Sequence, residues 1–181
     1  MPVEIIWVVA IAILAIGAAR GVRAWVKYRG KRLITCPENH RPAGVTVDSG
    51  TAVLQAFGAG PGIRLSSCSR WPERSGCGQE CLSQIQAAPA DCLVRNILAQ
   101  WYAGKCCASC GRPFGEIQWA GAQPGLIRAD KVSVEWTQVA PEKLDETLAT
   151  ALPVCFACHT ANNLVRDHPE LAITRPRPVE R

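Results

Sequence analysis

Residues and motifs on which many enzymes depend are scarce in this chain of 181 residues. It has three histidines, no Gly-x-Ser-x-Gly segment to present a nucleophilic serine, and no glycine-rich loop of the phosphate-binding kind. No histidine is arranged with a nucleophile in a known catalytic pattern. These absences leave little support for a hydrolase or a nucleotide-dependent enzyme, and they favour a role other than catalysis.

Net charge is also scarce once the first 32 residues are set aside. The chain has 20 basic and 15 acidic residues, and its pI is near 8.8. Six of the basic residues but only one acidic residue, Glu4, fall within positions 1–32, so the remaining charges cancel. A nucleic-acid-binding domain would need a basic patch on its folded surface. We therefore expect no nucleic-acid partner.

The chain contains one long apolar segment, at its N-terminus. Residues 5–19 carry no charge, and residues 21–26 continue the apolar character around Arg20 and Arg23. A bilayer needs about 20 apolar residues in a helix, and long basic side chains can extend toward lipid headgroups. The sequence predicts a transmembrane anchor with a basic collar over residues 1–32, with residues 3–32 in contact with membrane lipid.

The collar predicts the orientation of this anchor. Basic residues next to a span usually stay on the cytoplasmic side. A secretory signal peptide would carry its positive charge before the apolar run, where this chain has Glu4, and a buried core helix is a further alternative. We expect a single-pass protein of the inner (plasma) membrane with its C-terminal domain in the cytoplasm. The collar consists of Arg20, Arg23, Lys27, Arg29, Lys31 and Arg32.

Ten cysteines are the dominant feature of the composition. In an exported protein they would suggest disulfides, whereas in a reducing cytoplasm thiols more often bind metals. The stronger of two expected sites combines Cys107-x-x-Cys110 with Cys155-x-x-Cys158. Two such pairs supply the four-thiolate tetrahedral shell that zinc prefers, and Gly111 permits the tight turn that follows Cys110.

This pattern resembles the treble-clef zinc finger, in which one cysteine pair lies in a hairpin and the other begins a helix. It also resembles the zinc framework of HNH-type nucleases, whose second pair often reads Cys-x-x-Cys-His. Those nucleases need a histidine between the two pairs, and residues 113–155 contain none. The resemblance therefore implies a degenerate framework without nuclease activity. The whole chain also resembles membrane-anchored, cysteine-rich bacterial proteins, which implies no activity.

Cys155, Cys158 and His159 also form the five-residue motif for covalent attachment of c-type haem. In that alternative His159 is the axial iron ligand, and the domain is exported. The opposite iron ligand is hard to find, because the lone methionine is Met1, which leaves His40 or His168.

A weaker site is expected upstream, where cysteines are irregularly spaced. If residues 77–87 are helical, Cys77 and Cys81 lie one turn apart on one face. Cys36 and Cys68 are the best candidates to complete the set, with Cys92 as the alternative. Such a set suits zinc or an iron–sulfur cluster, although buried free thiols remain the simpler interpretation. The neighbouring loop, residues 69–74, could bind a partner or shield a cluster; the favoured interpretation is that Trp71 covers the edge of the core and that Arg70 and Arg74 are solvated.

The predicted fold class is α+β, with the anchor followed by a small metal-stabilised, cysteine-rich domain. Residues 33–104 are expected to form a first cysteine-rich subdomain, residues 105–170 a zinc-finger-like subdomain, and residues 171–181 a disordered tail. Helices are predicted over 51–57, 79–87, 92–102, 144–152 and from 159 to 167. Strands are predicted over 33–36, 45–47, 63–67, 116–119, 126–128 and 132–136.

These features predict a membrane-anchored cytoplasmic protein that binds two zinc ions and has a structural or partner-binding role, with a protein partner at the membrane. The alternative is a membrane-associated redox protein that carries an iron–sulfur centre, or a c-type haem if the domain is exported.

Overall fold

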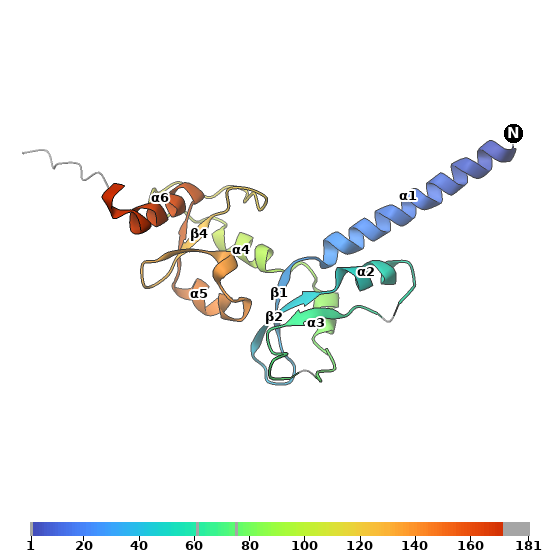
Figure 1. Cartoon of the computed structure of the whole chain (residues 1–181), viewed down its shortest axis with the longest axis horizontal. Helices are drawn as coiled ribbons and strands as arrows, with labels where there is room; N and C mark the ends of the chain where they lie inside the picture. Colours follow the sequence, from blue (N-terminus) through green and yellow to red (C-terminus); the bar gives the residue numbers. More distant parts are fainter. Residues whose placement is uncertain (1, 61, 75, 172–181) are drawn as a thin grey trace, which may run out of the picture. The chain divides into compact units, whose positions relative to one another are not determined.

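The computed structural model describes residues 2–60, 62–74 and 76–171 (Figure 1). The fold is mixed α+β, and the chain divides into two compact units, residues 1–97 and 98–181. Each unit has its own three-stranded antiparallel sheet and its own group of cysteines. The expected tail falls largely on residues 172–181, which lie outside the described residues.

Helix α1 (Pro2–Tyr28) contains the apolar segment. Its part from Glu4 to Tyr28 has a mean hydropathy of 2.3 and is long and apolar enough to cross a membrane, a property that anchors and signal sequences share. Only 6% of its most apolar stretch is buried within the protein. Glu4 in the first turn and Lys27 in the last turn complement the helix dipole. The described residues therefore contain one N-terminal apolar helix whose most apolar stretch is left largely uncovered.

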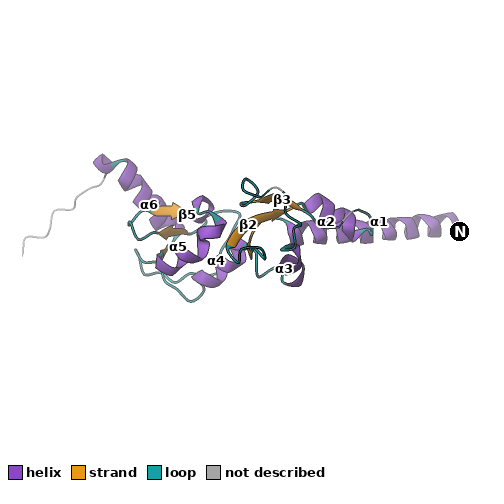
Figure 2. Cartoon of the chain, turned by 90° about the horizontal axis from the view of Figure 1, so that it is seen from below, coloured by secondary structure: helices purple, strands orange, loops and turns teal. Residues whose placement is uncertain are grey.

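Helix α2 (Ser49–Ala56) lies alongside α1 (Figure 2). Asp48 caps its N-terminus by accepting hydrogen bonds from the backbone N–H groups of Gly50 and Thr51. A side chain at Gly17 would place its Cβ 3.3 Å from the Phe57 ring, so the absence of one lets that ring approach α1 closely. Phe57 is nevertheless 55% exposed, and it extends the apolar surface of α1.

The sheet of the first unit has the order β1-β2-β3, with β1 at Lys31–Thr35, β2 at Pro42–Val47 and β3 at Leu65–Cys68. Alternate residues of β1 and β2 point into a core that helix α3 (Leu82–Ala87) closes with the fully buried Ile85. The core also holds the side chains of Ile34, Ala43, Val45, Val47, Leu65, Cys36 and Cys81.

Arg32 departs from its expected role in the basic collar. Its side chain is fully buried, and it donates hydrogen bonds to the carbonyl oxygens of Lys27, at 2.5 Å, and Pro89. It also contacts the sulfur of Cys92 at 3.6 Å. A buried guanidinium is tolerated only where it is hydrogen-bonded. Arg32 therefore ties the end of α1 to the loop before α4 instead of facing lipid headgroups.

The second unit begins within helix α4 (Val94–Tyr102) and has a sheet of order β5-β4-β6. The buried Tyr102 donates a hydrogen bond of 2.7 Å to the carbonyl of Gly125 at the start of β4. The strands are β4 (Gly125–Ile127), β5 (Ser133–Glu135) and β6 (Leu152–Val154), and the helices are α5 (Leu144–Thr150) and α6 (Phe156–Asp167). Short 3₁₀ turns occupy Trp136–Gln138, Pro141–Lys143 and Pro169–Leu171.

Three predicted elements differ from the observed ones. Helix α3 begins at Leu82 because Gln79 has a φ of 58°, which is incompatible with a right-handed helix, so the helical argument for Cys77 and Cys81 is wrong. Residues 116–119, predicted as a strand, form bends and turns. The helix predicted over 144–152 overlaps strand β6 at Leu152. The observed helix α5 ends at Thr150, because Pro153 disfavours a helical conformation at the residue before it.

Candidate metal centre

Four cysteine sulfurs in the second unit lie together. The Sγ atoms of Cys107, Cys110, Cys155 and Cys158 are all within 4.8 Å of one another. The Sγ atoms of Cys110 and Cys155 are 3.8 Å apart. A tetrahedral zinc–thiolate shell with bonds of about 2.3 Å has sulfur–sulfur edges of about 3.8 Å. The four sulfurs therefore form a group whose spacing is consistent with one metal ion.

A tight backbone turn places the first pair of sulfurs. The N–H of Cys107 donates to the carbonyl of Arg112 at 2.8 Å, and the N–H of Gly111 donates back to the carbonyl of Cys107 at 2.8 Å. Gly111 has a φ of 72°, the left-handed conformation that glycine adopts without strain. The turn is closed by a β-bridge between Cys106 and Pro113. Both sulfurs of the pair consequently leave the turn on one side.

The second pair stands at the start of α6, directly after β6. Cys155 is the N-cap residue, and its extended backbone is followed by the first helical turn that carries Cys158. The backbone N–H of Cys155 donates to the sulfur of Cys107 at 3.3 Å. A backbone hydrogen bond of 2.8 Å from Ala108 to Pro153 joins the two turns. Main-chain contacts therefore fix one pair against the other.

The ionisation of these thiols is uneven. Hydrogen bonds from the backbone and then the guanidinium of Arg112 lower the pKa of Cys110 to about 6. The pKa of Cys158 is raised to about 12, first because its thiol is hydrogen-bonded to Cys155 and then because of burial. Metal binding requires thiolates, so a cation bound here must displace the Cys158 proton. The pKa of Cys107 is also lowered, because hydrogen bonds from backbone N–H groups outweigh its burial, so the four-sulfur group combines thiols that ionise readily with the reluctant Cys158.

His159 is engaged within the fold. Its side chain is 6% exposed, its Nδ1 lies 2.6 Å from the hydroxyl of Ser133, and its Nε2 lies 3.3 Å from the amide nitrogen of Asn163. Its ring also packs against the backbone of Gly125. An axial iron ligand would need a free ring nitrogen. This arrangement disfavours the haem alternative at Cys155, Cys158 and His159.

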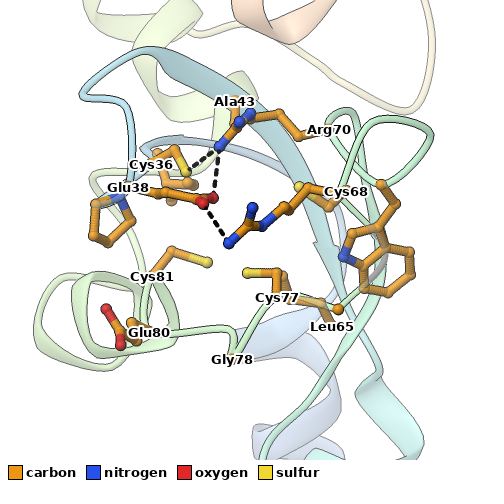
Figure 3. Close-up of a pocket in the computed structure, with 15 residues that line it drawn as sticks. Cys36, Glu38, Ala43, Leu65, Cys68, Arg70, Cys77, Gly78, Glu80 and Cys81 are labelled. Carbon is orange, nitrogen blue, oxygen red and sulfur yellow. Dashed lines mark hydrogen bonds and ion pairs between the residues drawn. The ribbon is translucent and has the colours of Figure 1, made fainter.

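The first unit gathers a second set of cysteines around a cavity of about 260 Å³ (Figure 3). The cavity is lined by Cys36 just after β1, Cys68 at the end of β3, Cys77 in a loop, and Cys81 at the N-cap of α3. Cys92 does not line it and instead lies beside Arg32. Burial, reinforced by the neighbouring thiols, raises the pKa of Cys81 to about 11.

The two sets differ in compactness. Cys107, Cys110, Cys155 and Cys158 form the compact set. Within the described residues, it is the single group in which three or more side-chain atoms that could bind a metal, from Cys, His, Asp or Glu, lie within 4.8 Å of one another. The sulfurs around the cavity are therefore more widely spaced. Of the two zinc sites expected from the sequence, the geometry provides one that matches a single metal ion.

Sequence reasoning missed the role of two arginines at this cavity. Arg70 donates a hydrogen bond of 2.9 Å to the sulfur of Cys36 and lies 3.4 Å from Glu38 (Figure 3). Arg74 forms an ion pair with the same carboxylate at 2.8 Å. Arg70, two residues after Cys68, is therefore not simply solvated. The position of Arg70 two residues after a cysteine was the sequence feature that could have indicated its contact with a cysteine sulfur.

Comparison with known proteins gives no relative: no family model, curated protein or solved structure matches this chain. The functional argument therefore rests on the two groups of cysteines and the apolar helix.

Proposed function

We propose that this chain is a membrane-anchored zinc-binding protein whose cytoplasmic domain has a structural or partner-binding role. The observation that carries the proposal is the compact group of four sulfurs at Cys107, Cys110, Cys155 and Cys158. Four thiolates in a closed shell leave no open coordination position for substrate, which is typical of structural zinc sites. The zinc therefore stabilises the second unit and does not act as a catalyst.

The surrounding fold supports the same interpretation. The first cysteine turn precedes the antiparallel pair β4–β5, and the second pair begins helix α6. This order of turn, hairpin and helix is that of a treble-clef-like framework. Helix α6 exposes Phe156 at its start and Leu164 and Val165 near its end, each about half exposed. Exposed apolar side chains supply contact area at protein-binding surfaces, so a protein partner would dock on the last turns of α6, at Leu164 and Val165.

The zinc proposal is tested by the metal content of the full chain purified in detergent. We expect one zinc ion to be held by the second unit. Zinc affinity, measured by competition with a chelator, should fall at least about tenfold per unit decrease in pH, because protons compete for the Cys158 thiolate. The decline should steepen below pH 6, where the Cys110 thiolate also protonates. A second unit that is free of metal, or a pH-independent affinity, would contradict the proposal.

The orientation is tested separately with two reporters fused after Arg181. We expect a fluorescent protein that folds in the cytoplasm to be active there and alkaline phosphatase, which requires export, to be inactive, because the collar keeps the C-terminal side inside. The control replaces Arg20, Arg23 and Lys27 with Gln, which should weaken this preference. Active phosphatase on the unchanged chain, or a chain cleaved after α1, would overturn the anchor orientation.

A further inference from the structure

The cavity in the first unit has an unusual lining for a protein interior. Four thiols reach it from three separate parts of the chain, and Figure 3 shows the side chains of Cys36, Cys68, Cys77 and Cys81 directed toward it. Cys36 and Cys81 are both buried in the core of the unit. Buried free cysteines usually pack as small hydrophobic residues, which would fill such a space and not surround it. The lining therefore points to a bound group.

The cavity is too large, and its sulfurs are too widely spaced, to match a single tightly bound metal ion. No three of its sulfurs lie within 4.8 Å of one another among the described residues, whereas a zinc–thiolate shell needs edges of about 3.8 Å. The same chain achieves this compact spacing at Cys110 and Cys155. The cavity volume of about 260 Å³ is several times the roughly 30 Å³ share of one water molecule. The space suits a group of several heavy atoms.

The backbone around the cavity resists collapse onto a smaller ion. Cys36 follows β1 directly, and its N–H and C=O are bonded to Arg41 and His40 at 2.9 Å each. Cys68 is paired with Val45 in the sheet. These main-chain contacts hold the ends of β1 and β3, and with them Cys36 and Cys68, in place. A polynuclear cluster fits this wider spacing, because its thiolates are distributed over two or more iron atoms.

The remaining contacts of the sulfurs are those that stabilise an iron–sulfur cluster. Arg70 donates a hydrogen bond of 2.9 Å to Cys36, and the backbone N–H of Gln79 donates one of 3.3 Å to Cys77. Hydrogen bonds to ligating sulfurs and nearby positive charge are the main protein influences on such clusters. Leu65, which is buried, and the partly buried Trp71 give the same cavity an apolar part of its lining.

We propose that Cys36, Cys68, Cys77 and Cys81 hold one iron–sulfur cluster in the first unit. This inference shares the proposed cytoplasmic location but does not depend on zinc in the second unit. Four cysteine thiolates are the usual ligand set of such clusters. The ligands come from β1, β3 and the segment before α3, so the cluster also joins these elements. Arg70 is a positioning residue that acts through Cys36.

The test is the composition of the full chain purified anaerobically in detergent. We expect iron and acid-labile sulfide in equal amounts, a broad visible absorbance, and one zinc ion counted separately in the second unit. A variant with Cys77→Ser and Cys81→Ser should lose iron, sulfide and colour and keep its zinc. The matched control Cys92→Ser should keep all of them, because Cys92 lies outside the cavity.

Two zinc ions without sulfide, or iron that persists in the double variant, would overturn the cluster. If the full chain holds iron and sulfide but no zinc at Cys107, Cys110, Cys155 and Cys158, the proposed function is contradicted and the cluster is not. A second variant, Arg70→Gln, guards against loss of cluster through misfolding because it leaves all four thiols in place. It should keep its iron and shift the reduction potential to more negative values, since a positive charge is removed beside Cys36. An unchanged potential would contradict the role of Arg70 as a positioning residue that acts through Cys36.

Discussion

Replacement of Cys155 and Cys158 by serine is expected to release the zinc and unfold the second unit. Binding of structural zinc contributes about 10 kcal/mol or more in small zinc domains, which is comparable with the whole stability of a domain of this size. The main-chain contacts that join the two cysteine turns are few, and the turns would lose the ion between them. The measurements are zinc content and amide hydrogen exchange across β4 and α6.

The matched control is Cys106→Ser, which changes an exposed cysteine next to Cys107 that does not belong to the four-sulfur group. It should retain one zinc and unchanged exchange rates. Exchange in the first unit should be unaffected by either change, since its core is made of its own residues. If the double serine variant keeps its zinc, or if Cys106→Ser loses it, the assignment of the ligands is incorrect.

The sequence predicted the compact cysteine group because its signal is local. Each Cys-x-x-Cys pair places two sulfurs on one turn, and the glycine after Cys110 indicates the turn conformation. Because structural zinc prefers four ligands, the two pairs are then expected to share one ion. The apolar helix was equally accessible, because composition and length over 25 residues suffice to identify it.

The first cysteine set was harder because its members come from distant strands. Nothing local indicates that Cys36 and Cys68 end on the same side of a sheet; that depends on the register of β1, β2 and β3. The helical argument for Cys77 and Cys81 failed at Gln79, whose left-handed conformation is supported by a hydrogen bond from Leu65 to its side chain. Such tertiary contacts override local helix preference.

Arg32 shows that the burial of a charged residue is equally hard to predict from the sequence. In the sequence it is one of six basic residues after the apolar segment, and no pattern separates it from Arg29 or Lys31. Its burial follows from the position of the loop at Pro89, almost sixty residues later. The side chains that a fold buries against distant carbonyl groups cannot be identified from charge spacing alone, which is why the collar was overestimated by one residue.

The second large effect is expected at Gly125, where the described residues leave no space for a side chain. A Cβ there would lie 2.7 Å from Nδ1 of His159 and 3.1 Å from the carbonyl oxygen of Val134. The His159 ring cannot move away freely, because Ser133 and Asn163 hold its nitrogens. Gly125→Ala should therefore cost about 3 kcal/mol in the free energy of unfolding of the second unit. Denaturant unfolding of the zinc-bound protein measures it.

Gly121→Ala is the matched control, because a Cβ at that position meets nothing within 4 Å and its cost should stay within about 0.5 kcal/mol. Adding His159→Ala to Gly125→Ala should recover part of the loss, since the ring that clashes is gone; this coupling is the signature of a direct contact. His159→Ala alone should destabilise the unit and still retain one zinc, because His159 lies outside the four-sulfur group. Loss of zinc from this variant would make His159 a ligand and reopen the haem-like interpretation of the Cys155–His159 motif. Additive losses in the double variant would place the strain at Val134 instead.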